Sequence, residues 1–146
     1  MISTPTILKC LWAAMGLYWL ASAVRTKKTA VNEAAASRIP RLILLGLMFT
    51  MLLTDVFRIG WLARRYLPEY PWTPPVGVAV TVAGLALAVW ARRHLGEYWS
   101  DKVALKVDHQ LIRSGPYAVL RHPIYSGVLL AIAGSVLAIG EWRGVL

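Results

Sequence analysis

Residues Val76–Ala91 read VGVAVTVAGLALAVWA, an apolar run without a single charged side chain. A membrane-spanning helix needs about 20 mostly apolar residues, and the flanks of this run can lengthen it. Gly84 and Ala88 are four residues apart, so they fall on one face of the expected helix. Faces of this kind let membrane helices approach closely. The run therefore predicts a membrane helix that packs tightly against a neighbour.

Three further runs have the same apolar character, and they are Thr6–Val24, Leu42–Ala63 and Ile124–Gly140. The last of them carries Gly127, Ala131 and Ser135 at the same four-residue spacing of small side chains. We expect an all-α fold, a polytopic membrane helix bundle of about four transmembrane helices. Residues 1–146 then form a single membrane domain.

The composition agrees with a membrane protein. Of 146 residues, 58% are hydrophobic and 16% are charged, whereas soluble domains carry about 25% charged residues. The mean hydropathy is +0.55. A single cysteine, Cys10, excludes an internal disulfide. The start of the chain lacks a basic region and a small-residue cleavage site, which favours a retained first helix over a signal peptide.

The basic residues behind the formal net charge of +9 are distributed as the membrane orientation requires. Most lysines and arginines lie in the connections 25–41 and 92–121, and basic connections face the cytoplasm. We therefore expect the N-terminus outside, the polar segment before the last helix inside, and a location in the cell's inner (plasma) membrane. Attraction to anionic lipids accounts for the charge. Membrane lipids are thus expected partners, and nucleic acid is not.

Two features mark the expected outer end of the bundle. Asp55 and Arg58 are three residues apart and share a helix face, which favours an interfacial ion pair over a functional site inside the membrane. The following connection carries Tyr66, Tyr70 and Trp72. Aromatic side chains of this kind form a belt at membrane interfaces.

The polar segment before the last helix reads HQLIRSGPYAVLRHPIYSG, from His109 to Gly127. Gly115 and Pro116 break the chain, and Pro123 suits the first turn of a helix. Arg121 and His122 then lie at a helix N-terminus, where free N–H groups favour an anion.

The side chains around this N-terminus suit a ligand with an anionic end and a planar part. Arg121 offers a forked, permanently charged donor, and His122 donates or accepts near neutral pH. Tyr117 and Tyr125 add aromatic faces, which also favour a cationic centre. A nucleotide-like cofactor fits this description. Lipid head groups held by Arg121 and His122, with interfacial tyrosines, fit it equally well, so the residues alone leave both interpretations open.

Two elements of this segment resemble the signature of a known family. Gly115-Pro116-Tyr117, followed by RHPIYSG at residues 121–127, is similar to the signature of the isoprenylcysteine carboxyl methyltransferase family. Its prokaryotic members and the membrane phospholipid methyltransferases share this architecture. His109–Ile112 also matches the pattern, as does Leu95-Gly96 with Trp99-Ser100. The resemblance covers about residues 95–140.

The resemblance implies an S-adenosylmethionine-dependent methyltransferase that acts on a lipophilic small molecule or a lipidated group. A cofactor-loop segment over about residues 95–127 would close the cofactor pocket from the cytoplasm. The residues implied to line that pocket are His109, Leu111, Gly115, Tyr117, Arg121, His122 and Tyr125. The resemblance assigns no catalytic residue and no metal, and it leaves the methyl acceptor and the oligomeric state open.

The chain departs from the family pattern at its end. Members continue into a further membrane helix and a cytoplasmic tail with an Arg and a Glu-Glu pair, whereas this sequence stops at GEWRGVL. The expectation is a truncated or a naturally short relative, whose competence is open. Two other functions therefore stay in consideration. One is a sterol-reductase-like membrane enzyme that uses NADPH and shares the RHPxY element, and the other is a non-catalytic membrane module.

Overall fold

The computed structural model describes residues 3–23, 43–44, 46–47, 49–68, 70–96 and 114–145. Within these ranges the fold is all-helical, with no strand and one isolated bridge between Arg65 and Glu141. The expectation of an all-α fold is confirmed for this part of the chain. Its elements are α1 (Thr4–Ala23), a helical stretch ending at Leu53, η1 (Gly60–Ala63), α3 (Thr73–Leu95), η3 (Gly115–Ala118), α4 (Pro123–Ile139) and η4 (Trp142–Gly144).

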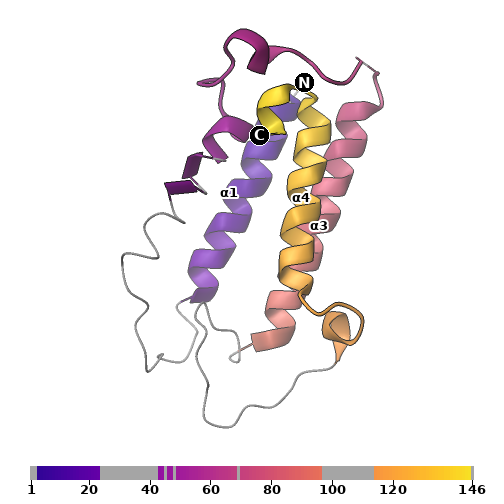
Figure 1. Ribbon diagram of the computed structural model, residues 1–146. Helices are drawn as coiled ribbons and strands as arrows, with labels where there is room; N and C mark the ends of the chain where they lie inside the picture. Colours follow the sequence, from indigo (N-terminus) through magenta and orange to yellow (C-terminus); the bar gives the residue numbers. More distant parts are fainter. Residues whose placement is uncertain are drawn as a thin grey trace.

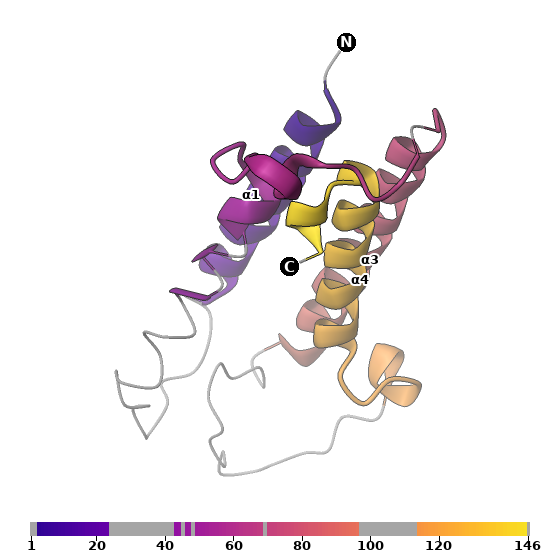
Figure 2. The same ribbon diagram turned by 45° about the horizontal axis from the view of Figure 1, so that its top comes forward.

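The long helices lie side by side and alternate in direction (Figure 1). Helices α1 and α3 run from the end that holds both termini to the opposite end, and α4 runs back. Turning the molecule shows the last residues of the chain beside the segment that follows residue 43 (Figure 2). The two ends of the molecule therefore carry different segments of the chain. The termini lie at one end, and residues 114–122, which precede α4, lie at the other.

Helices α3 and α4 touch through their backbones. A Cβ atom placed on Gly84 would lie 2.5 Å from the carbonyl oxygen of Gly127, and one on Gly127 would lie 2.6 Å from that of Gly84. Gly134 has the same relation to Thr81, at 2.5 Å from its backbone nitrogen. The predicted close approach through small residues is confirmed, and it extends over more of both helices than the sequence indicated.

A buried hydrogen-bonded group joins three helices at this contact. The indole N–H of Trp12 donates to Ser135 Oγ at 3.0 Å, and Ser135 donates to the Ala131 carbonyl at 2.8 Å. Thr81 donates to the Gly77 carbonyl at 2.9 Å, and its hydroxyl lies 3.3 Å from that of Ser135. Each polar group finds a partner inside the apolar core, as burial requires. The group therefore fixes α1 against the α3–α4 pair.

The second helix is shorter than expected. A single helix over 42–63 was predicted, but the described helical residues end at Leu53, and a turn follows before η1. Thr54 donates its hydroxyl to the Thr50 carbonyl at 2.7 Å, a bond that competes with continued helix. Gly60 has a positive φ of 53°. The turn frees Asp55 and Arg58 to meet the end of the chain instead of each other along a helix.

Those two residues enter an ion cluster with Glu141 and Arg143. Arg143 contacts Glu141 at 2.7 Å and Asp55 at 3.4 Å, and Arg58 contacts Glu141 at 3.3 Å. Arg143 also donates to the Thr54 carbonyl. Glu141 and Arg143 are each only 6% exposed. The predicted pair of Asp55 with Arg58 is not formed, because the helix ends before them and each pairs instead with one of the chain's last residues.

The helices also bear on the expected membrane spans. Among the described residues, α3 is the one helix long and apolar enough to cross a membrane, and α4 is a shorter apolar helix of 17 residues. Helix α3 is longer than the predicted 76–91 because it starts at Thr73, where Pro74 and Pro75 occupy the first turn. Proline there removes no helical hydrogen bond.

We predict that Gly84→Ala destabilises the protein because its Cβ would press on the α4 backbone, at a cost of about 1–3 kcal/mol. Gly16→Ala is the matched control, since Gly16 lies in α1 and an added Cβ there would have nothing within 4 Å. At that position the substitution should raise helix stability by up to about 1 kcal/mol. Unfolding in mixed detergent micelles measures both. Equal effects of the two substitutions would contradict the backbone contact.

We predict that Arg143→Met lowers the free energy of unfolding by about 3 kcal/mol, because it leaves the buried Glu141 carboxylate with fewer partners. Asp55→Asn is the control, since the Asp55 side chain is 71% exposed and exposed pairs contribute less than about 1 kcal/mol. The same unfolding assay compares them. A loss from Asp55→Asn as large as that from Arg143→Met would show that burial does not govern the cluster.

Candidate functional site

The candidate site lies at the end of the molecule where α1 and α3 stop and α4 begins. The chain enters it at Ser114 and folds as η3 before α4 starts at Pro123. Gly115 has φ +59°, a conformation that favours glycine. Pro116 and Pro123 are buried, and the Leu120 N–H donates to the Pro116 carbonyl at 3.0 Å. Residues 114–122 thus form a short ordered loop against the helix ends.

Arg121 and His122 lie immediately before α4, as the sequence predicted. His122 has an extended φ of −133°, and Pro123 occupies the first helical turn. The backbone N–H and the hydroxyl of Ser126 both donate to the His122 carbonyl, at 3.0 and 3.1 Å. The helix therefore starts at a fixed residue, and its free N–H groups face the same end as the loop.

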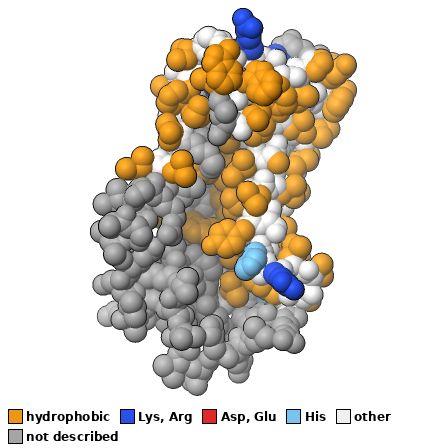
Figure 3. Space-filling view, viewed as in Figure 1, with side chains coloured by type: hydrophobic (Ala, Val, Ile, Leu, Met, Phe, Trp, Pro, Cys, Tyr) orange, Lys and Arg blue, Asp and Glu red, His pale blue; other side chains and the backbone are white. Residues whose placement is uncertain are grey.

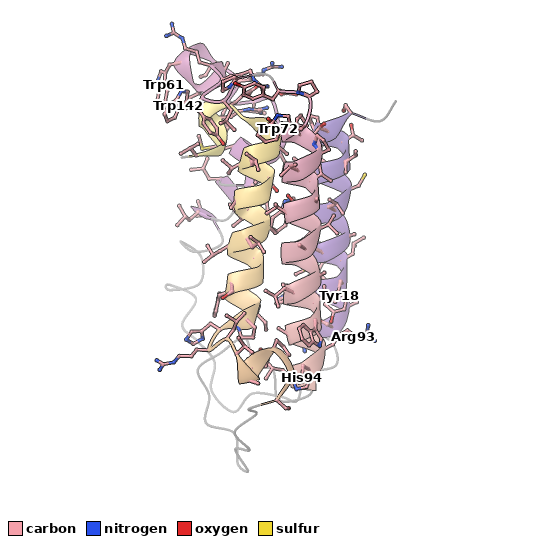
Figure 4. The ribbon with its side chains drawn as sticks, turned by 90° about the vertical axis from the view of Figure 1, so that its right-hand side faces the viewer. Tyr18, Trp61, Trp72, Arg93, His94 and Trp142 are labelled. Carbon is pink, nitrogen blue, oxygen red and sulfur yellow. The ribbon has the colours of Figure 1, made fainter. Side chains whose placement is uncertain are left out.

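His94, in the last turn of α3, contacts the loop directly. Its Nε2 lies 2.8 Å from Ser114 Oγ, and its ring stacks on that of Tyr117 with centroids 6.4 Å apart and planes at 22°. A Cβ on Gly115 would lie 2.7 Å from His94 Cε1, so the imidazole occupies the space that a side chain there would need. Figure 4 shows His94 at this end of α3, near Arg93 and Tyr18.

Arg92 is buried, 4% exposed, where two helices end. It donates to the carbonyl of Gly96, just after α3, at 3.1 Å, and to that of Ser22, near the end of α1, at 3.0 Å. A cation is favoured at the negative C-terminal ends of helices. These two bonds join α1 to α3 beneath the loop. Arg92 also affects Tyr117: burial raises the pKa of the Tyr117 phenol, and the charge of Arg92 partly opposes that shift.

Arg121, His122 and Tyr125 form an exposed group at the start of α4. The rings of His122 and Tyr125 meet edge to face with centroids 6.2 Å apart. Tyr125 is 71% exposed, and Arg121 and His122 are exposed as well. Both acidic residues in the described ranges, Asp55 and Glu141, belong to the ion cluster at the other end of the molecule.

The visible face of the molecule reflects this distribution. The part of it that is drawn in colour is largely hydrophobic, and a histidine and a basic side chain lie together on it toward the end that carries the loop (Figure 3). Basic side chains beside a helix N-terminus attract an anionic ligand. No cluster of three metal-ligating side chains occurs within the residues that the structure describes.

The sequence-predicted residues fall into two groups. Gly115 and Tyr117 lie under His94, while Arg121, His122 and Tyr125 are exposed at the start of α4. His109 and Leu111 lie outside the described residues.

Sequence reasoning missed three residues at this site: Arg92, His94 and Ser114. It assigned the basic residues after Ala91 to topology alone. Their position at the last turn of an apolar helix was an available signal, since basic side chains there interact with the helix's terminal carbonyls.

Residues 77–145 match the model of the Isoprenylcysteine carboxyl methyltransferase (ICMT) family. The resemblance predicted from the sequence is confirmed for this segment, which contains most of α3, the loop and α4. A curated protein of Bacillus subtilis (strain 168), "Uncharacterized protein YpbQ", is 28% identical over 110 residues. That alignment covers 74% of this chain and 61% of the relative, so the chain spans less than two thirds of it. No solved structure matches the chain.

We predict that Gly115→Ala loosens the loop, because its Cβ displaces the His94 ring from Ser114 and Tyr117. Hydrogen exchange of the amides of residues 117–120 should accelerate about tenfold, the equivalent of one lost hydrogen bond. Gly60→Ala is the control, since Gly60 has a similar φ of 53° with nothing within 4 Å of an added Cβ. It carries the same kind of backbone strain at the other end of the molecule. Unchanged exchange in Gly115→Ala would contradict the contact.

Proposed function

We propose that the chain is a membrane-embedded S-adenosylmethionine-dependent methyltransferase that acts on a lipophilic acceptor. One observation carries the proposal: the segment that matches the ICMT family folds into a loop and a helix N-terminus, and the five implied residues that the structure describes lie on these two elements. The family match supplies the reaction class. The geometry supplies a place for an anionic, partly aromatic cofactor.

We also propose that α1, the helix before residue 54, α3 and α4 span the membrane as a polytopic bundle. Helix α3 has the length and hydropathy for it. Large apolar side chains are exposed along all these helices, among them Leu17, Leu20, Leu44, Val82 and Leu129. Exposed apolar area on this scale calls for a lipid environment rather than water.

The ends of the bundle fit an orientation with the loop in the cytoplasm. Trp61, Trp72 and Trp142 are exposed together at the end opposite His94 (Figure 4), where they would form an interfacial belt. The end that carries Arg93 and Arg121 would face the cytoplasm under the positive-inside rule. In this proposal the N-terminus lies outside, and the protein resides in the inner (plasma) membrane.

The described residues fit the cofactor in chemical type. S-adenosylmethionine has a carboxylate, an adenine ring and a sulfonium cation. Arg121 would hold the carboxylate, helped by the N-terminus of α4. Tyr117 and Tyr125 would pack near the adenosine or the cation, while Gly115 and His122 complete the described part of the pocket. His109 and Leu111 would contribute from the preceding segment.

The protein's own contribution to the reaction is positional. Bound S-adenosylmethionine supplies an already activated methyl group. The loop and the start of α4 would orient it and exclude water, because alignment of two reactants is the main demand of an in-line displacement. A carboxylate acceptor needs no general base at neutral pH, so no residue is assigned that role. The acceptor, a lipophilic molecule or a lipidated group, would approach from the bilayer beside Tyr125 and Leu129, both exposed on α4.

We predict that the full gene product binds S-adenosylmethionine in detergent and that Arg121→Ala/His122→Ala weakens the affinity. Loss of charge-assisted hydrogen bonds predicts a decrease of about 10- to 100-fold. Isothermal titration calorimetry measures it. Arg93→Ala is the matched control, because Arg93 is an exposed cation in the last turn of α3 at the same end, and its loss should change the affinity by less than about threefold.

Three outcomes would oppose the proposal. Equal losses in the double variant and in Arg93→Ala would show a general charge effect instead of a site. Preferential binding of NADPH would favour a reductase of the sterol type. Binding of neither molecule would favour a non-catalytic membrane module.

A further inference from the structure

We propose that His94 is a positioning residue: it holds the Ser114–Tyr117 loop against the end of α3 and thereby places Tyr117 in the cofactor site. This inference rests on the proposed function for the role of Tyr117. The docking itself rests on contacts between His94 and the loop.

One side chain makes contacts of three kinds with this loop. The imidazole Nε2 lies 2.8 Å from Ser114 Oγ, its ring lies over Gly115, and its face stacks on Tyr117. The hydrogen bond restricts the direction of Ser114 from the imidazole, and the ring stack restricts the orientation of the Tyr117 ring. Together they define the position of the loop relative to α3. The absence of a Cβ at Gly115 is what admits the ring so close to the backbone.

Within the described residues 114–122, the rest of the loop is more open. Val119 is 86% exposed, and Ala118 is exposed as well. Within the loop, the Tyr117 N–H donates to the Ser114 carbonyl at 3.2 Å and the Leu120 N–H to that of Pro116, bonds that shape the loop without attaching it to α3. Pro116 is buried, but an apolar contact does not restrict the orientation of the loop. Among the described contacts, those of His94 with Ser114 and Tyr117 are therefore directional ones between the loop and α3.

The position of Tyr117 depends on the same contact. Its ring is half-buried between the loop and the helix end, and burial raises the pKa of its phenol. If the loop leaves α3, that ring becomes solvated, and its pKa should return toward 10.0. Tyr117 thus reports loop docking in the absence of any cofactor.

Two variants separate the two contacts of the imidazole. His94→Phe keeps a ring over Gly115 and Tyr117 but loses the bond to Ser114, and His94→Gln keeps a hydrogen-bonding group but loses the ring. His94→Ala loses both. Arg93→Ala is the control for a change in the same helical turn, and far-ultraviolet circular dichroism verifies that each variant folds.

The test measures the docking and the cofactor separately in the full gene product. Docking is measured by hydrogen exchange of the amides of residues 117–120 and by ultraviolet titration of Tyr117, taken as the difference from the same protein carrying Tyr117→Phe. We expect His94→Ala to accelerate exchange and to weaken S-adenosylmethionine binding, each by about tenfold. The Tyr117 titration should shift to lower pH. His94→Phe and His94→Gln should each restore part of both, and Ser114→Ala should add nothing to His94→Phe.

Two results would overturn the inference. Unchanged exchange and titration in His94→Ala would show that His94 does not dock the loop. A loosened loop with unaltered S-adenosylmethionine affinity would show that the docking does not serve the site. If the parent protein binds no S-adenosylmethionine, the proposed function fails and the positioning of Tyr117 for that cofactor fails with it, while the exchange and titration still report the docking itself.

Discussion

The backbone contact between α3 and α4 is the constraint on which the other arrangements depend. Gly84 and Gly127 bring the two helices so close that neither admits a Cβ. In lipid, helix association gains little from apolar burial, so close packing and polar bonds must supply it. Thr81 and Ser135 extend the contact with buried hydroxyl groups, and Trp12 ties α1 to it through Ser135. The backbone contact between α3 and α4 therefore determines how the three helices are positioned.

The α3–α4 contact also determines which helix ends lie together at the candidate site. Since α3 and α4 are antiparallel, the C-terminal end of one lies beside the N-terminal end of the other, and carbonyls and N–H groups without helical partners meet there. Arg92 satisfies carbonyls of α1 and α3. His94 attaches the loop, and the N–H groups of α4 stay available. A shift of α4 along α3 would separate these groups, so tight packing far from the loop keeps the site assembled.

The sequence predicted the small-residue face because glycine and alanine spacing is local information. It likewise predicted the start of α4, since Gly115-Pro116 and Pro123 permit few backbone alternatives. The end of the second helix was not predictable in this way. Asp55 and Arg58 look like a helical pair, but their partners, Glu141 and Arg143, lie more than 80 positions away. His94 was missed for the same reason, because its partners are 20 or more residues later.

The described arginines at the two ends of the molecule differ in their partners. At the terminal end, Arg143 and Arg58 both pair with Glu141, so the charges of these two arginines are compensated within the protein. At the loop end, the described residues include no acid that could neutralise Arg121. Both ends have arginines, but among the described residues those at the terminal end include an acid-paired group and Arg121 does not belong to one. A cation beside a helix N-terminus suits an anionic cofactor. This arrangement, with the family match over the same segment, is why the loop end is the candidate site.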